Sequence, residues 1–89
     1  MITTFTGHKW INFKNGYTLS IYNGFGSYSE NHFNFKVIDK PIIRTKNCEI
    51  AITYNNKFVT DSILQCGGDV KGYVDKEELK EIIKKVKEL

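Results

Sequence analysis

Apolar and polar residues alternate over residues 10–22, with an Asn-Gly pair near the middle of the stretch. This pattern is typical of a β-hairpin with a tight turn. A loop made of the Asn-Gly pair alone would divide the apolar residues between the two faces of the hairpin. A three-residue loop that begins at Lys14, with Gly16 left-handed, instead places Phe13 opposite Tyr17, so that the larger apolar residues share one face. We predict this second register.

A second hairpin is predicted over residues 48–60, where strand-forming residues alternate on the N-terminal side of two asparagines at 55–56. Asparagine tolerates positive φ and therefore suits a tight turn. Between the two hairpins, apolar residues alternate with polar ones over 33–37, which predicts a further strand. Pro41 has no backbone N–H, so the residues that follow it are restricted to an edge strand or a loop.

Residues 76–89 carry apolar side chains at the spacing of an amphipathic helix. Asp75 is placed to cap the free amides at the start of this helix, and Glu78 to bond back to the Asp75 amide in a capping box. The other positions are mostly Lys and Glu, as on a solvent-exposed surface. The apolar face consists of Leu79, Ile82, Ile83, Val86 and Leu89.

These elements predict a single α+β domain over residues 1–89, in which a twisted antiparallel sheet of three to five strands packs against one C-terminal helix. The composition agrees, because 40% hydrophobic and 26% charged residues are ordinary values for a globular protein. A chain of this length buries only roughly 60% of the surface that its unfolded form exposes. We therefore expect a small hydrophobic core.

The net charge of +3 is mildly basic. A dedicated duplex-binding domain carries a denser basic stripe, so the charge neither requires nor excludes nucleic acid as a partner. No apolar run reaches the 18 or more residues of a membrane span, and the polar start MITTFTGHKW lacks the features of a signal peptide. We expect a cytoplasmic protein that does not enter a membrane.

Candidate chemistry is sparse. His8, His32, Cys48 and Cys66 are scattered without the paired spacing of a zinc site, and we expect free thiols, no metal and no cofactor. The carboxylates form no spaced pair for acid–base catalysis, and no serine lies in a nucleophile elbow. We therefore expect no enzymatic activity.

The stretch YNGFGSYS, residues 22–29, resembles a glycine-rich phosphate loop only in Gly24 and Gly26. A third glycine would be needed at position 29, which is Ser29, and no helical pattern follows. The pattern favours a bend at the end of a twisted strand over a phosphate cradle.

Aromatic and basic residues gather around this bend and in the segment that follows it. Aromatic rings and Arg dominate the binding energy of protein interfaces, and the same rings next to Lys and Arg can also stack bases of single strands. The alternative is a half-buried sheet surface beside a solvated basic loop. The candidate partner-binding residues are Tyr22, Phe25, Tyr28, Phe33, Phe35, Lys36, Lys40, Arg44 and Lys46.

Four strings together resemble a group of short, mostly uncharacterised proteins encoded by phages and prophages of low-GC Gram-positive bacteria. They are FKNGYTLSI at 13–21, GSYS at 26–29, CEIAI at 48–52 and DVKGYVDKEELKEII at 69–83. Relative to that pattern, residues 30–46 are an addition, which we expect to be an exposed insertion that carries individual function. The group supplies no catalytic residues.

The resemblance implies a location in the host bacterial cytoplasm and a role against host defence. Our first hypothesis is a non-enzymatic inhibitor, such as an anti-CRISPR protein, that binds a host defence complex and blocks it sterically. The second is a protein that binds a nucleotide or single-stranded nucleic acid and acts as a sponge for a signal. The third is a phage structural or assembly component. The sequence leaves the formation of a homo-oligomer open.

Overall fold

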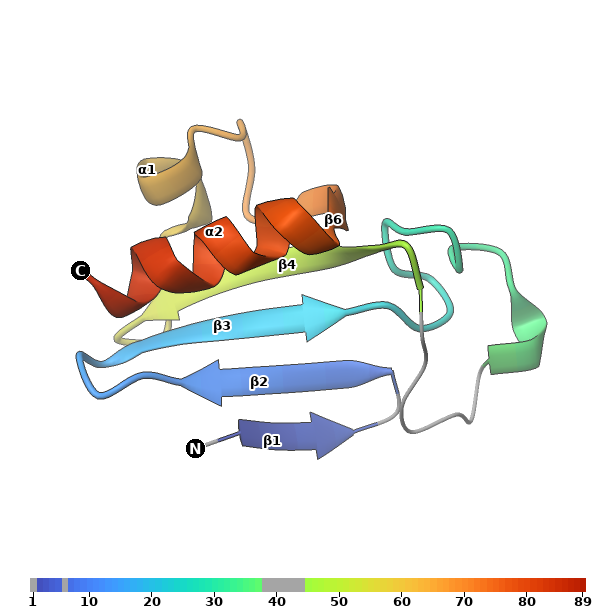
Figure 1. The fold of residues 1–89 in the computed structure, drawn as a ribbon, viewed down its shortest axis with the longest axis horizontal. Coiled ribbons are helices and arrows are strands. Elements are labelled where there is room, and N and C mark those ends of the chain that lie inside the picture. The colour runs from blue at the N-terminus through green and yellow to red at the C-terminus, as the bar shows by residue number, and fades with distance from the viewer. Residues whose placement is uncertain (1, 6, 38–44) are drawn as a thin grey trace.

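The computed structural model describes residues 2–5, 7–37 and 45–89, which form an antiparallel sheet with two helices on one of its faces (Figure 1). This arrangement confirms the predicted α+β fold with a C-terminal helix packed on a twisted antiparallel sheet. The strands β1 to β5 follow one another across the sheet, and β6 pairs with β4 beside β5. The elements are β1 (Ile2–Phe5), β2 (His8–Asn12), β3 (Tyr17–Tyr22), the 3-10 helix η1 (Phe35–Val37), β4 (Asn47–Tyr54), β5 (Lys57–Phe58), α1 (Thr60–Leu64), β6 (Lys71–Asp75) and α2 (Lys76–Lys87).

Both predicted hairpins are confirmed, although the second strand of the hairpin predicted over 48–60 ends at Phe58 and Thr60 already begins α1. The Phe13 amide donates to the Tyr17 carbonyl at 2.9 Å, and Gly16 has a φ of +93°, so the first loop has three residues in the predicted register. In the second hairpin, Asn55 and Asn56 have φ values of +52° and +62°. Two consecutive positive φ angles are those of the type I′ turn, whose twist matches that of the flanking strands.

The hydrophobic core lies between the sheet and the two helices. Alternation along β3 and β4 directs Leu19, Ile50 and Ile52 to the face that α2 covers, where each is fully buried. The predicted apolar face of α2 meets them through Ile82 and Val86. Partly buried side chains around this centre are Ile11, Phe13, Tyr17, Ile21, Val59, Ile63, Leu64, Leu79 and Ile83.

Helix α2 starts directly at the end of β6. The Asp75 side chain accepts a hydrogen bond from the Glu78 amide at 2.8 Å, which confirms the predicted N-cap. The reciprocal half of the predicted capping box is wrong, because the Glu78 carboxylate is instead paired with Lys71 at 2.9 Å. This ion pair ties the first turn of the helix to β6.

The strand predicted over 33–37 is wrong for these residues. They form turns followed by η1, because nearby asparagines bond to the backbone in place of a neighbouring strand. Asn34 Oδ1 accepts from the Lys36 amide at 3.1 Å, and the Asn34 amide donates to the Asn31 carbonyl at 3.1 Å. The insertion predicted over 30–46 is described only at its two ends.

The buried Thr60 hydroxyl connects β4 to the chain between β5 and β6. Its oxygen accepts from the Ile52 amide at 2.8 Å and donates to the Asp69 carbonyl at 2.7 Å. Both partners belong to the backbone, so they have no rotamer that could turn toward water. The Thr60 hydroxyl therefore joins β4 to the segment before β6, although Ile52 and Asp69 are distant in the sequence.

We expect Thr60→Val to lower the free energy of unfolding by about 1–3 kcal/mol, because a methyl of similar size leaves the Ile52 amide buried without an acceptor. Urea denaturation measures the effect. Ser62→Ala, in the exposed part of α1, is the control and should change stability by less than about 0.5 kcal/mol. Equal stability of Thr60→Val and the unmodified protein would show that the hydroxyl is dispensable.

Candidate functional site

Residues 23–37, named here the aromatic loop, fold around a polar interior. Ser27, Ser29 and Asn31 are buried, with exposed fractions of 0%, 2% and 6%. The Ser27 hydroxyl donates to the Gly24 carbonyl at 2.7 Å and accepts from the Ser29 hydroxyl at 2.6 Å, while the Asn31 side chain donates to the Asn23 carbonyl at 3.0 Å. Short hydroxyl and amide side chains thus satisfy the backbone of the loop from within.

The base of the aromatic loop is fixed to the sheet. The Tyr28 carbonyl accepts from the Tyr73 amide of β6 at 2.8 Å, and the Tyr28 amide donates to the Glu49 carboxylate of β4 at 3.1 Å. The Glu30 amide donates to the Asn47 side chain at 2.7 Å. In Figure 1 the loop lies beyond the end of β3, at the same end of the sheet as the start of α2.

Gly72 permits this close approach. A Cβ on residue 72 would lie 2.7 Å from the Tyr28 Cβ and 3.2 Å from the Tyr28 carbonyl oxygen. Neither atom is the end of a flexible side chain, so any larger residue would have to move the loop or β6. The YNGFGSYS stretch is therefore a bend, as predicted from the sequence, and the structure shows that it is held against β6.

The outer side of the aromatic loop exposes large rings. Phe33 is 80% exposed, Phe35 is 70% exposed and Tyr28 is 51% exposed. Neighbouring rings support them, because His32 stacks on Tyr28 with a centroid distance of 5.5 Å and meets Phe33 edge to face at 4.4 Å. The result is a set of aromatic side chains held outward on a hydrogen-bonded base.

The structure brings together some of the predicted partner-binding residues and separates others. Phe25, whose ring lies 4.8 Å from that of Phe35, joins the aromatic set, and Lys36 is exposed beside it. Tyr22 does not join it, because its hydroxyl donates to the Phe25 carbonyl and its ring lies against His8. Lys46 lies on the sheet side of the loop, where its amide donates to Glu30. Lys40 and Arg44 lie outside the described residues.

Sequence reasoning did not include His32, Tyr73 or Trp10 among the candidate partner-binding residues. His32 joins the aromatic set through its stacking on Tyr28. Tyr73 is 59% exposed with a φ of +53°, a strained angle for a tyrosine, and no sequence signal marked it. On the sheet face turned away from α2, Trp10 stacks on His8 with a centroid distance of 3.7 Å. Burial lowers the pKa of His8 below its usual value.

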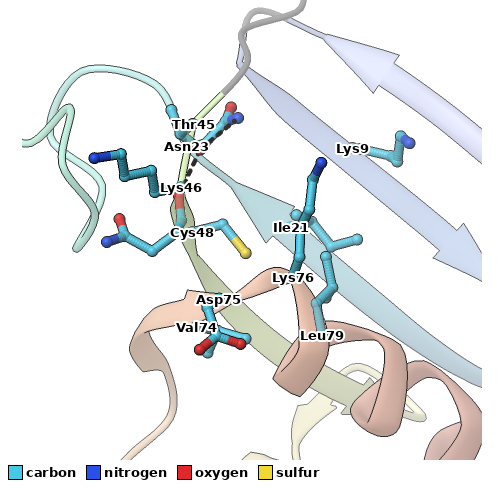
Figure 2. A pocket seen from close by; sticks show the side chains of 11 residues that line it. Lys9, Ile21, Asn23, Thr45, Lys46, Cys48, Val74, Asp75, Lys76 and Leu79 are labelled. Atoms are coloured by element: carbon cyan, nitrogen blue, oxygen red, sulfur yellow. Dashed lines mark hydrogen bonds between the residues drawn. The ribbon is translucent and has the colours of Figure 1, made fainter.

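A pocket of about 470 Å³ lies next to the base of the loop, between the start of α2, the C-terminal end of β3 and the N-terminal end of β4 (Figure 2). Its lining includes Ile21, Val74 and Leu79 from the edge of the core. Amide and hydroxyl groups line the wall next to the loop, and lysines come from three separate segments. The polar lining residues are Lys9, Asn23, Thr45, Lys46, Asn47, Asp75 and Lys76.

Cys48 also lines the pocket, but its thiol is a poor nucleophile. Burial raises the pKa of Cys48 to about 11, with a further contribution from the negative charges of Glu78 and Glu49. A nucleophilic or metal-binding cysteine needs its thiolate form, which this environment disfavours at neutral pH. The structure does not bring His8, His32, Cys48 and Cys66 together, and within the described chain no group of three such ligands could hold a metal ion.

Comparison with known proteins does not place the chain in a family, because no family model, curated protein or solved structure matches it. Among residues 2–5, 7–37 and 45–89, no helix is long and apolar enough to cross a membrane.

We expect Gly72→Ala to lower the free energy of unfolding by about 1–3 kcal/mol and to release the aromatic loop, because the added methyl cannot fit against Tyr28. Urea denaturation measures the stability, and hydrogen exchange at the Tyr73 amide reports the contact with the loop. Gly68→Ala is the matched control, since its Cβ would meet nothing closer than the Val70 carbonyl at 4.0 Å. Unchanged protection of the Tyr73 amide in Gly72→Ala would contradict the close packing.

The raised pKa of Cys48 predicts a loss of stability at alkaline pH. The thiol has its ordinary pKa of 9.0 when the chain is unfolded and about 11 when folded, so its contribution is complete below pH 9 and is lost as the pH rises through 11. The expected loss is about 2 kcal/mol. Cys48→Ala lacks this term, so the unfolding free energies of the two proteins should converge between pH 8 and 11. A constant difference would disprove the assignment.

Proposed function

We propose that the protein is a non-enzymatic inhibitor that binds a bacterial defence complex, such as a CRISPR effector, and blocks it sterically with the aromatic loop. The observation that carries this proposal is the exposure of Phe33 and Phe35, at 80% and 70%, on a loop whose base is hydrogen-bonded to β4 and β6. The choice of a defence complex as partner comes from the resemblance to short phage and prophage proteins.

Energetics support a binding role for these rings. Complete burial of one phenylalanine side chain is worth roughly 1.5–3 kcal/mol, so two exposed rings leave a substantial free energy available to an interface. Buried aromatic anchors contribute most of the energy in many protein interfaces. Because the loop is already held in place, little conformational entropy remains to be lost on binding.

The basic charge of the chain supports an acidic partner surface or a partner that carries nucleic acid. The chain has a net charge of +3, and Lys36 is exposed within η1 beside the aromatic rings. A basic surface is attracted to an acidic protein surface or to a complex that carries nucleic acid, and repelled by other basic surfaces. A basic inhibitor is unsuited to imitating DNA, so the proposed mechanism is occlusion of the partner's surface.

The proposal assigns no chemical step to the protein. The Cys48 thiol lines the pocket, and its raised pKa keeps it protonated at neutral pH. His8 is hydrogen-bonded to the Ser20 hydroxyl at 2.5 Å and stacked on Trp10. The contacts of His8 are structural and Cys48 belongs to the hydrophobic core, so the proposal gives neither group a chemical role.

Phe33→Ala should abolish capture of the partner while leaving the fold intact, because the Phe33 ring is mostly exposed in the free protein. The affinity-tagged protein is incubated with lysate of a low-GC Gram-positive bacterium that has an active CRISPR system. Captured proteins are identified by mass spectrometry, and nuclease activity of the captured complex is assayed. Loss of a central aromatic anchor costs about 2 kcal/mol or more, which is roughly thirtyfold in affinity.

Phe58→Ala is the matched control, since Phe58 is 56% exposed but lies in β5, at the opposite end of β4 from the aromatic loop. It should capture the same partner as the unmodified protein, and all three proteins should have the same melting temperature. Failure to capture any defence component, or an equal loss of capture in Phe58→Ala, would exclude the proposed role of the loop.

A further inference from the structure

We infer that the pocket at the start of α2 binds a phosphate monoester attached to an organic group of nucleotide size. The pocket lies on the sheet side of the aromatic loop and uses none of its exposed rings. The inference is therefore independent of the proposed inhibitor function.

The first reason is the gathering of cations. Lys9 on β2, Lys46 before β4 and Lys76 at the start of α2 all line the pocket. Figure 2 shows Lys9 and Lys76 on the same side of the pocket, near Ile21, whereas the Lys46 amine points away from them. Among the described residues, none of these lysines forms a salt bridge, since the ion pairs present join Lys71 to Glu78 and Lys80 to Glu77.

Among the described residues of the lining, Asp75 is the one carboxylate, and it offsets only one of these positive charges. Asp75 Oδ1 accepts from the Glu78 amide at 2.8 Å and so serves as the cap of α2. Lys9 and Lys76 lie on one side of the pocket and Lys46 also belongs to its lining, so positive charges outnumber the negative charge of Asp75 among the described lining residues. Like charges placed around one hollow repel each other, and a dianionic phosphate relieves that repulsion.

The second reason is the size and mixed lining of the pocket. A volume of about 470 Å³ is within the range of small-molecule sites and exceeds what inorganic phosphate fills. Ile21, Val74 and Leu79 offer apolar contact to an organic group. On the wall next to the loop, Asn23 donates to the Thr45 hydroxyl at 3.3 Å, which donates to the Asn47 carbonyl at 2.5 Å, so this wall is already ordered.

The pocket is better suited to a small ligand than to a nucleic acid chain. Duplex recognition requires phosphate contacts repeated along a surface, and single strands are held by aromatic rings beside a basic groove. The pocket instead has one group of lysines and no aromatic side chain in its lining. A mononucleotide combines the phosphate and the apolar, hydrogen-bonding body that this lining would recognise.

The test is a titration of the ¹⁵N-labelled protein followed by NMR, with AMP, adenosine and inorganic phosphate as separate probes. AMP should cause saturable shifts centred on the amides of Asn47, Cys48 and Lys76, and each of the other two probes should bind more weakly. The double variant Lys9→Gln and Lys76→Gln should raise the Kd for AMP by roughly tenfold or more, because it removes two charged donors.

The matched control is Lys84→Gln with Lys87→Gln, which makes the same change in net charge on the exposed surface near the other end of α2. This control should bind AMP as the unmodified protein does. Equal weakening by both double variants, binding of inorganic phosphate as tight as that of AMP, or no saturable shift with AMP would each overturn the inference. Partner capture by the Lys9→Gln, Lys76→Gln variant should be unchanged, which separates this result from the test of the aromatic loop.

Discussion

Pairing of strand β4 along both of its edges is the constraint on which the rest of the structure depends. One edge pairs with β3 over Glu49–Tyr54, while the other is divided between β5 at its C-terminal part and β6 at its N-terminal part. The chain must therefore leave β5, turn and return to the same edge as β6. Helix α1 and the buried Thr60 hydroxyl lie in that connection. The hydroxyl bonds to the Ile52 amide and the Asp69 carbonyl, so these backbone groups have partners where β4 changes from pairing with β5 to pairing with β6.

The position of β6 then determines both candidate sites. Because α2 begins at Lys76, directly after β6, the pairing of β6 with β4 sets where the helix starts and brings Lys76 to the pocket. The same strand presents Gly72 and the Tyr73 amide to the aromatic loop. Displacement of β6 would alter the loop, the helix start and the pocket together, although these segments are far apart in the sequence.

The sequence was most informative where structure is local. The three-residue loop with Gly16, the asparagine turn at 55–56 and the Asp75 cap each depend on a few neighbouring residues, and each was predictable from turn and capping chemistry. Strand β6 was not, because glycine is rare within strands and Tyr73 has a positive φ, and both features follow from the irregular pairing with β4 and the contact with the aromatic loop. The alternation at 33–37 was misleading, because local asparagine hydrogen bonds outweighed the period-two pattern.

The candidate sites were likewise predictable from the sequence only in part. The sequence named Phe25, Tyr28, Phe33 and Phe35 as candidate partner-binding residues, and in the structure Tyr28, Phe33 and Phe35 are exposed. The grouping of Lys9 with Lys46 and Lys76 was not predictable, because it depends on which ends of three distant segments meet.

The two candidate sites also share a wall. Glu30 of the aromatic loop bonds to the Asn47 side chain and accepts from the Lys46 amide, and both of those residues line the pocket. A phosphate ester held by the pocket would therefore act on the segment that fixes the base of the loop. Any change that such a ligand makes in the affinity for a partner must be matched by an equal effect of the partner on the ligand, because coupling free energies are reciprocal. Residues 45–47 line the pocket and also bond to the base of the loop, so any such coupling would pass through this segment.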